Sequence, residues 1–346
     1  MSIDAALSGR QKKWKYMIIM MFLAILSLVT AMGIQKKDLL FSSLPVGEGD
    51  VIWSEVSAGR DARTSVTDSG IYLLTKGRLT NLKDSPGGMG QTVPGDTMEG
   101  GFCLAVFEAL GRELYLPENG EVISFSGSIL SVSVGKESYL SAIISASGYR
   151  TKTVVFTEQG EIIGEIPLRD KTMVESVFLK EDSLLAALCL TDGGDWECLL
   201  YTPEGKLLHS ADLRCAVCYE LLPLGEYVGI RTGNGIQVIS HEGKLVSEIS
   251  GTIDLWIVSE HYIACVAGDQ LKTYTPEGDL LGEAVLPYYP KHISALGNRI
   301  YIHYGEGIGC YHPTGELLWF RREGSMAYAL QPFSCGCVLI PFLENW

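Results

Sequence analysis

One pattern of turn and strand recurs along this chain and limits what the chain can fold into. The segment YTPEGKLLHSADL at 201–213 returns as YTPEGDLLGEAVL at 274–286 and as YHPTGELLWFRRE at 311–323. In each copy Pro fixes φ at about −65° and Gly supplies a positive φ, so the chain turns into an outgoing strand. Similar turn glycines recur with a period of about 38 residues, at Gly88, Gly120, Gly160, Gly205, Gly243, Gly278 and Gly315. Such a period is typical of a solenoid or a propeller.

Each repeat contains four runs of strand-forming residues, separated by Gly, Pro, Asn and Asp. The repeat that ends with the second quoted copy consists of IDLWIVS, YIACVAG, QLKTYT and DLLGEAVL. A four-stranded sheet cannot bury both of its faces alone, so neighbouring repeats have to stack. The pattern therefore predicts an all-β fold, a β-propeller with one repeat in each blade.

The number of repeats decides how the ring closes. Residues 46–346 hold about eight periods, which predicts an eight-bladed propeller; seven blades are the alternative, because the stretch 84–102 is irregular. One spare strand, DVIWSEVS, precedes the first complete repeat, and MAYALQP and CGCVLIPF follow the last turn. We expect strands from both ends of the chain to complete the last blade, which would remove an exposed sheet edge.

The segment 16–34 is a run of 19 residues without a charge. As a helix it would be about 28 Å long, close to the hydrocarbon thickness of a bilayer. Four basic residues precede it and two follow, which places the N-terminus in the cytoplasm and the rest of the chain outside. A cleaved signal peptide is the alternative, because Val29 and Ala31 have the spacing of a cleavage site.

These features predict a single-pass protein of the cell membrane with four segments. They are a basic cytoplasmic tail (1–15), a transmembrane helix (16–34), a stalk (35–48) and an external propeller (49–346). The net charge is −14 although the first 37 residues are basic, so the propeller is strongly acidic. Such a surface repels nucleic-acid phosphates, and we expect no nucleic-acid partner.

The last copy of the repeat resembles that of pyrroloquinoline-quinone-type propellers, in which a Thr-Gly turn is followed by Trp. The matching residues are Thr314, Gly315 and Trp319; the other copies hold Ser124, Gly164, His209, Ser247 and Gly282 at the Trp position. The whole layout is similar to an uncharacterised family of membrane-anchored propellers from clostridia and related Gram-positive bacteria, with repeats also like those of WD40 proteins. The resemblance implies the fold and the location, and it implies no activity.

The nine cysteines mostly occur within apolar strands, where buried free thiols are expected. Cys215 and Cys218 have the spacing of a redox or zinc motif, but no second CxxC accompanies them. On one strand, residues three apart would also point to opposite faces. The six histidines have no metal-ligand spacing. We therefore expect neither a metal nor a cofactor.

Two loops contain residues that also occur in ligand sites. Gly305, Gly307 and Gly309 have the density of a phosphate loop, but no helix follows them, which favours a hairpin. The segment TDGGDWE contains Asp192, Asp195 and Glu197, but it lacks the ligand spacing of a calcium loop and also favours a hairpin turn.

Tyr288 and Tyr289 are the binding candidates. They lie between two prolines in LPYYPKH, a connection between blades, and would reach a propeller face where partners dock. The alternative is that both rings pack against neighbouring blades.

The sequence predicts a non-enzymatic binding or scaffold module at the cell surface, with a protein or a cell-envelope component as ligand. It contains no recognisable catalytic motif, such as a G-x-S-x-G nucleophile elbow. The alternative is a quinoprotein or glycan-cleaving enzyme with its site in the central channel, where the first strands offer Glu175, Asp254 and His292. A role in envelope assembly is a third hypothesis.

Overall fold

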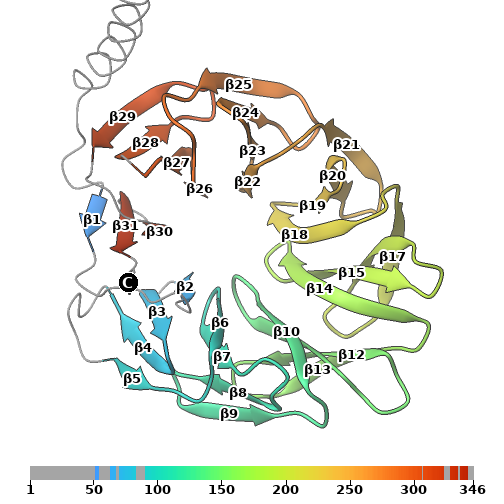
Figure 1. The fold of residues 1–346 in the computed structure, drawn as a ribbon. Helices are drawn as coiled ribbons and strands as arrows, with labels where there is room; N and C mark the ends of the chain where they lie inside the picture. Colours follow the sequence, from blue (N-terminus) through green and yellow to red (C-terminus); the bar gives the residue numbers. More distant parts are fainter. Residues whose placement is uncertain are drawn as a thin grey trace, which may run out of the picture. The chain divides into compact units, whose positions relative to one another are not determined.

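The computed structural model describes residues 51–53, 63–67, 70–82, 90–305, 307–322, 328–333 and 336–341. Residues 47–346 form one compact unit, and its described part consists of β-strands joined by turns (Figure 1).

Seven sheets have four antiparallel strands that pair in the order of the chain, and we number them as blades 1 to 7. Blades 1 to 3 consist of β2 (Arg63–Val66), β3 (Ile71–Thr75), β4 (Arg78–Asn81) and β5 (Gln91–Thr92); β6 (Thr97–Gly100), β7 (Leu104–Phe107), β8 (Glu113–Leu116) and β9 (Glu121–Ser124); and β10 (Ile129–Val134), β11 (Tyr139–Ile144), β12 (Thr151–Thr157) and β13 (Ile162–Leu168). Blades 4 and 5 consist of β14 (Lys171–Leu179), β15 (Leu184–Thr191), β16 (Trp196–Tyr201) and β17 (Leu207–Leu213); and β18 (Cys218–Leu224), β19 (Tyr227–Thr232), β20 (Gly235–Ser240) and β21 (Leu245–Ser250). Blades 6 and 7 consist of β22 (Leu255–Val258), β23 (Ile263–Ala267), β24 (Gln270–Tyr274) and β25 (Leu280–Val285); and β26 (His292–Leu296), β27 (Arg299–His303), β28 (Gly307–Tyr311) and β29 (Leu317–Arg322).

The two ends of the propeller meet in a three-stranded sheet. It contains β1 (Val51–Trp53), β30 (Tyr328–Phe333) and β31 (Gly336–Pro341), and β1 pairs with β31 in parallel. In this sheet β30 takes the place of a blade's first strand. It contacts the first strands of the neighbouring blades, β26 of blade 7 and β2 of blade 1. The ends of the described propeller are therefore joined by main-chain pairing, which protects edges that would otherwise be exposed.

The prediction of an eight-bladed propeller is wrong. The fold is a seven-bladed all-β propeller, because only seven of the described sheets have four strands. The eight-blade count, length divided by period, treated the strands at the two ends as a full blade, although the described residues at the ends supply only three strands. The irregular stretch 84–102, which made seven blades the alternative, still yields the short strand β5 and the start of blade 2.

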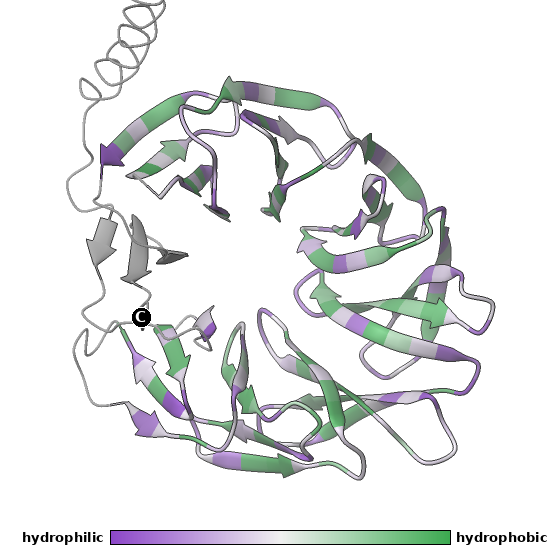
Figure 2. Cartoon of the chain, viewed as in Figure 1, coloured by the Kyte–Doolittle hydropathy of each residue, from purple (hydrophilic) through white to green (hydrophobic). Residues whose placement is uncertain are grey.

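The core lies between adjacent blades. Middle strands are buried on both faces and are therefore continuous apolar runs, as in β15, where Leu184 to Cys189 are all buried. Separate buried clusters join blades 1 and 2, 2 and 3, 3 and 4, 4 and 5, and 5 and 6. Apolar residues follow the strands and polar residues gather at many turns (Figure 2).

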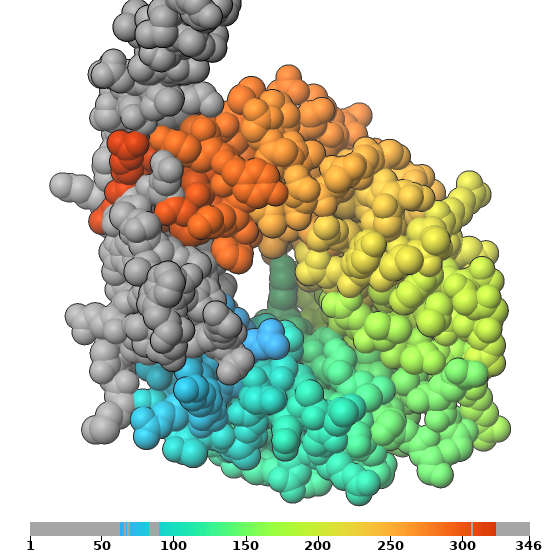
Figure 3. Space-filling model, in the orientation of Figure 1, coloured from blue at the N-terminus to red at the C-terminus, as the bar shows by residue number. Residues whose placement is uncertain are grey.

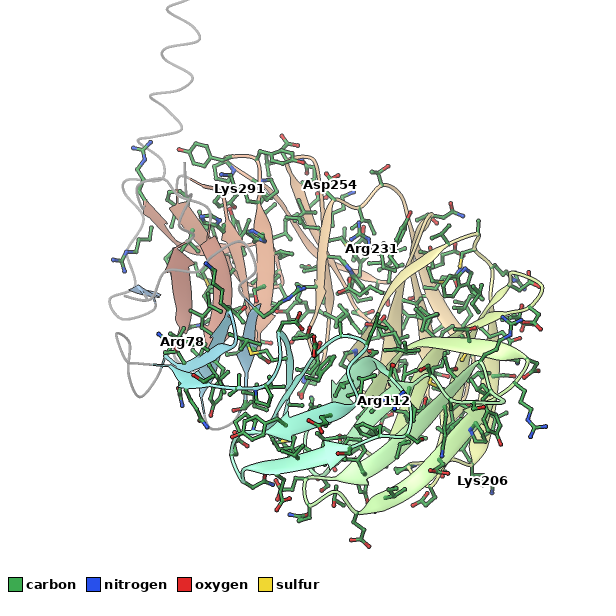
Figure 4. All side chains as sticks on the ribbon, turned by 60° about the horizontal axis from the view of Figure 1, so that its bottom comes forward. Arg78, Arg112, Lys206, Arg231, Asp254 and Lys291 are labelled. Atoms are coloured by element: carbon green, nitrogen blue, oxygen red, sulfur yellow. The ribbon has the colours of Figure 1, made fainter. Side chains whose placement is uncertain are left out.

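Antiparallel pairing divides the turns between two faces of the ring. Turns between the first and second and between the third and fourth strands of a blade lie on one face, which we call the hairpin face. Turns between the second and third strands, and the connections from one blade to the next, lie on the opposite, crossover face. Arg231, Asp254 and Lys291 lie along this crossover rim (Figure 4).

The recurrent turn has the predicted backbone. The glycine of each described copy has a positive φ, for example 91° at Gly205 and 87° at Gly315, and Gly205 donates its N–H to Thr202 O at 2.9 Å. The turn also packs on the outer strand of the preceding blade. A Cβ atom at Gly282 would lie 2.1 Å from the carbonyl carbon of Thr314, which explains why this copy lacks the large residue of the quinone-type repeat. Trp319 in the last complete blade is buried against Tyr301.

The part of the chain that the structure describes contains no helix with the length and apolar character to cross a bilayer. The predicted transmembrane helix (16–34), tail (1–15) and stalk (35–48) lie outside that part.

Candidate functional site

The described turns of the hairpin face are strongly acidic. These turns contain more acidic residues than lysines, and the lysines are Lys136, Lys180, Lys206 and Lys244. The acidic side chains are those of Glu118, Glu137, Glu158, Glu161, Glu181, Asp182, Glu204, Glu226, Glu242, Glu260, Glu277, Asp279 and Glu316. The crossover face carries both signs, with Arg112, Arg150, Arg169, Arg214 and Lys291 among its basic residues. The two faces therefore present different potentials to a charged partner.

The hairpin face is hollowed where the first hairpins of blades 3, 4, 5 and 6 come together. This acidic hollow has a volume of about 870 Å³. Five exposed carboxylates line it, from Glu137, Glu181, Glu226, Glu260 and Glu277. Phe178, Leu179 and Pro223 supply apolar lining. The ring of blades also surrounds a central opening (Figure 3).

One ion pair crosses the acidic hollow. Lys136 Nζ in blade 3 lies 2.5 Å from Glu260 Oε1 in blade 6, and both side chains are about 60% exposed. The lysine lowers the pKa of Glu260 by hydrogen bonding to its carboxylate. Two blades lie between the partners, so the pair bridges one side of the mouth of the ring. An exposed pair of this kind contributes little to stability, and it can open for a competing cation.

Asp182 fixes the wall between blades 3 and 4. Its carboxylate is buried and accepts backbone N–H groups of Lys136, Glu137 and Ser138 at 2.8 Å and of Tyr139 at 3.3 Å. Several N–H groups that converge on one carboxylate form a strong anion nest. Asp182 is therefore a structural acid that holds the backbone from which the side chains of Lys136 and Glu137 extend.

The turn that presents Asp182 has an uncommon backbone. Lys180, Glu181 and Asp182 have φ values of 50°, 50° and 63°, in the left-handed region that non-glycine residues rarely adopt. Such residues persist where surrounding contacts hold them, and here the four N–H donors supply those contacts. The turn projects Glu181 into the acidic hollow.

Two further contacts orient carboxylates in the acidic hollow. The Tyr227 hydroxyl donates to Glu277 Oε1 at 3.0 Å and so joins blade 5 to blade 6. Lys180 Nζ lies 3.9 Å from a carboxylate oxygen of Glu226, a loose ion pair between blades 4 and 5. The acidic hollow thus presents exposed carboxylates from four blades, and those of Glu226 and Glu277 have a side-chain partner from a neighbouring blade.

A second group of carboxylates lies on first strands, which face the centre of the ring. Burial raises the pKa of Glu99 in β6 and of Glu175 in β14 to about 7 each, and the charges of Glu220 and Glu99 also raise that of Glu175. Glu175 accepts the N–H of Leu221 at 2.9 Å, and Glu220 accepts the indole N–H of Trp256 at 2.7 Å. Of these three glutamates, the sequence analysis named only Glu175 as a residue of the channel.

The other predicted channel residues do not join this group. Asp254 precedes β22 and accepts the N–H of Gly268 at 2.7 Å, as part of a turn. His292 stacks on the buried His303, with 6.3 Å between the ring centroids. Burial lowers the pKa values of both rings, that of His303 to about 4. His303 is therefore neutral at pH 7.

Tyr288 and Tyr289 lie on the crossover face and have different environments. The ring of Tyr288 packs against Tyr304 and Phe320 of blade 7, at 5.9 and 6.0 Å between centroids. Tyr289 is 69% exposed. Tyr288 therefore has a packing role, whereas a binding role for either residue stays a prediction.

The loops that also resembled ligand sites are hairpin turns. Asp192 pairs with Arg150 at 2.6 Å, and the backbone carbonyl of Asp195 closes its turn by accepting the N–H of Thr191 at 2.9 Å. Gly307 accepts the N–H of Tyr304 in the turn between β27 and β28. Within the described ranges, no three His, Cys, Asp or Glu residues are placed to hold a metal ion. The seven cysteines whose side chains are described are free thiols.

No protein-family model and no curated protein matches the chain. Apo AztD from Citrobacter koseri is a similar solved structure, 14% identical, with a TM-score of 0.48 over 81% of this chain and 89% of that one. BamB from Moraxella catarrhalis is 13% identical, with a TM-score of 0.42 over 80% of each chain. KlHsv2 with loop 6CD replaced by a Gly-Ser linker is 10% identical, with a TM-score of 0.43 over 55% of this chain and 65% of its own, less than two thirds. Similarity at this level carries nothing about what the chain binds.

Proposed function

We propose that this protein is a non-enzymatic binding or scaffold module whose acidic hollow receives a basic segment of a protein partner. The observation that carries the proposal is the convergence of five exposed carboxylates from four blades on one concavity. Charge complementarity of this kind selects a partner and speeds its encounter. The apolar lining of Phe178 and Pro223 gives the aliphatic stems of lysine or arginine side chains a surface to pack on.

We further propose that the propeller acts outside the cell, anchored to the membrane through residues 16–34. The uncharged run and the basic flanks of that segment support this location. The proposed partner is then a protein of the cell envelope with a cationic segment.

The experiment is a titration of the full-length, detergent-solubilised chain into a fluorescent peptide of alternating lysine and alanine, read by anisotropy. Glu226→Lys changes the acidic hollow, and Asp269→Lys makes the same change of net charge at an exposed turn of the crossover face. We expect Glu226→Lys to weaken binding about tenfold and Asp269→Lys to weaken it by less than about twofold, because only the first charge lies beside the bound peptide. Equal losses in both variants would overturn the proposal, since they would reflect net charge alone.

A glycan-cleaving enzyme with its site in the channel is the second candidate. It is favoured by Glu175, whose raised pKa suits a general acid, near the carboxylates of Glu220 and Glu99. Release of reducing ends from cell-wall glycan that is lost in Glu175→Gln would support it. No release by the folded wild-type chain would leave the binding proposal alone.

A further inference from the structure

Two thiols on the crossover face lie in contact where sequence reasoning had separated them. Cys215 Sγ is 3.2 Å from Cys218 Sγ. Only Cys218 belongs to a strand, as the first residue of β18; Cys215 lies in the connection from blade 4, where its N–H donates to Leu213 O at 3.0 Å. The alternation of a strand therefore does not apply to this pair, and the two side chains do not point to opposite faces as expected.

The two thiols differ in access. Cys215 is partly exposed and lies between the exposed residues Arg214 and Ala216. Cys218 is buried in the core between blades 4 and 5, beside Cys215. Burial, followed by the hydrogen bond with Cys215, raises the pKa of Cys218. An accessible thiol with a protected thiol beside it is the arrangement of an attacking and a resolving cysteine.

We propose that Cys215 and Cys218 are a redox pair that forms an intramolecular disulfide by exchange with an external disulfide, either a small-molecule disulfide or that of an oxidoreductase. The Cys215 thiolate attacks one sulfur of the external disulfide, and the other sulfur leaves as a thiolate. The Cys218 thiolate then attacks Cys215 Sγ and releases the second external sulfur. The pair loses two electrons to the external disulfide, and the two protons of the thiols go to the two leaving thiolates.

The geometry needs little adjustment. The sulfur atoms have to approach from 3.2 Å to a bond length of about 2.05 Å, and the connection that carries Cys215 is exposed on the surface. The described residues place no third metal-binding side chain at the pair, which favours disulfide chemistry over zinc.

Oxidation would act on a small site beside the pair. Val217 accepts the N–H of Gly233 at 2.9 Å, and Tyr219 lies under the guanidinium of Arg231, at 5.8 Å from the ring centroid. Tyr219, Arg231 and Gly233 line a hollow of about 410 Å³ on the crossover face. The disulfide would close a loop of only four residues and remove little entropy from the unfolded chain. Its effect would therefore be a local change of structure and not a large gain in stability.

The test uses the full-length chain in glutathione buffers of increasing oxidised fraction, followed by acid quenching, alkylation under denaturing conditions and mass spectrometry. Trypsin cuts after Arg214 and Arg231, so one peptide, 215–231, contains both thiols. We expect this peptide to lose two hydrogens and to escape alkylation, while the peptide with the buried Cys103 stays fully alkylated. In Cys218→Ser, Cys215 should accumulate as a mixed disulfide with glutathione. In Cys215→Ser, thiol loss at Cys218 should be at least about tenfold slower than in the wild type, because the accessible thiol is gone.

Retention of both thiols in the wild-type peptide at the most oxidising ratio would overturn the proposal, as would a disulfide from either residue to another cysteine. The wild-type result stands without the variants, so poor folding of a variant leaves the test decisive. The readout is independent of the acidic hollow, which lies on the opposite face.

Discussion

No side chain fits at residue 135, because a Cβ atom on Gly135 would lie 2.3 Å from both carboxylate oxygens of Asp182. The close approach brings the hairpin of blade 3 onto that carboxylate and lets four backbone N–H groups reach it. The acidic hollow therefore depends on a buried acid that no ligand touches.

Replacing Asp182 should destabilise the protein more than replacing an exposed acid. Asp182→Ala leaves several N–H donors without their acceptor, so we expect a loss of about 3 kcal/mol in the free energy of unfolding, and a smaller loss for Asp182→Asn. Chemical denaturation measures it, with Asp279→Ala, an exposed acid of the same face, as the control. Equal denaturation midpoints for Asp182→Ala and wild type would show that the hydrogen bonds to this carboxylate do not stabilise the fold.

Removing Lys136 should strengthen the binding of a basic peptide. The amine competes for Glu260, and its loss frees a carboxylate in the acidic hollow, so we expect Lys136→Ala to bind the lysine–alanine peptide about fivefold more tightly. Lys244→Ala opens a comparable exposed pair with Glu242 outside the acidic hollow and serves as the control. Stability should change by less than about 1 kcal/mol. Weaker peptide binding by Lys136→Ala would contradict the role given to this pair.

Gly282→Ala should destabilise the packing between blades 6 and 7. The new Cβ would lie 2.1 to 2.5 Å from backbone atoms of Thr314, which cannot rotate away. We expect a loss of about 2 kcal/mol. Gly233→Ala is the matched control, since its Cβ would meet nothing nearer than 4.0 Å. Thermal unfolding distinguishes the two, and the same midpoint in both variants would refute the docking role of the turn.

The partly buried Glu175 should give stability a specific pH dependence. The pKa of Glu175 is raised by burial from 4.5 to about 7, so the unfolded chain loses this proton at lower pH than the folded chain. The contribution of Glu175 to stability therefore falls as pH rises from about 4.5 to 7 and stays low above that. Glu175→Gln, which keeps an acceptor for Leu221, should gain stability relative to the wild type across this window. Denaturation at pH 5 and pH 8 measures the gain, with exposed Glu283→Gln as the control; the same gain at both values would contradict the assignment.

The repeat could be predicted from the sequence because its turn chemistry is local. Pro and Gly at fixed offsets set the backbone of each turn, and Gly205 and Gly315 have the expected positive φ. The blade count failed because it depends on how many strands the two ends contribute, which a period does not contain.

The candidate site could not be predicted because its residues are close only after the ring closes. Glu137 and Glu277 belong to blades 3 and 6, and neither lies in a motif. The burial of Asp182 also has no local signal, since its N–H partners come from another blade. The contact between Cys215 and Cys218 was missed because both residues were considered on one strand, whereas β18 begins at Cys218.

Photo-crosslinking tests the central claim most directly. The lysine–alanine peptide, with a photoreactive group at its centre, is irradiated with the full-length chain, and the attachment sites are mapped by mass spectrometry. The account predicts that attachment concentrates on 136–139, 180–183, 225–227, 260–261 and 276–277. Attachment to the crossover face, or spread evenly over both faces, would contradict it.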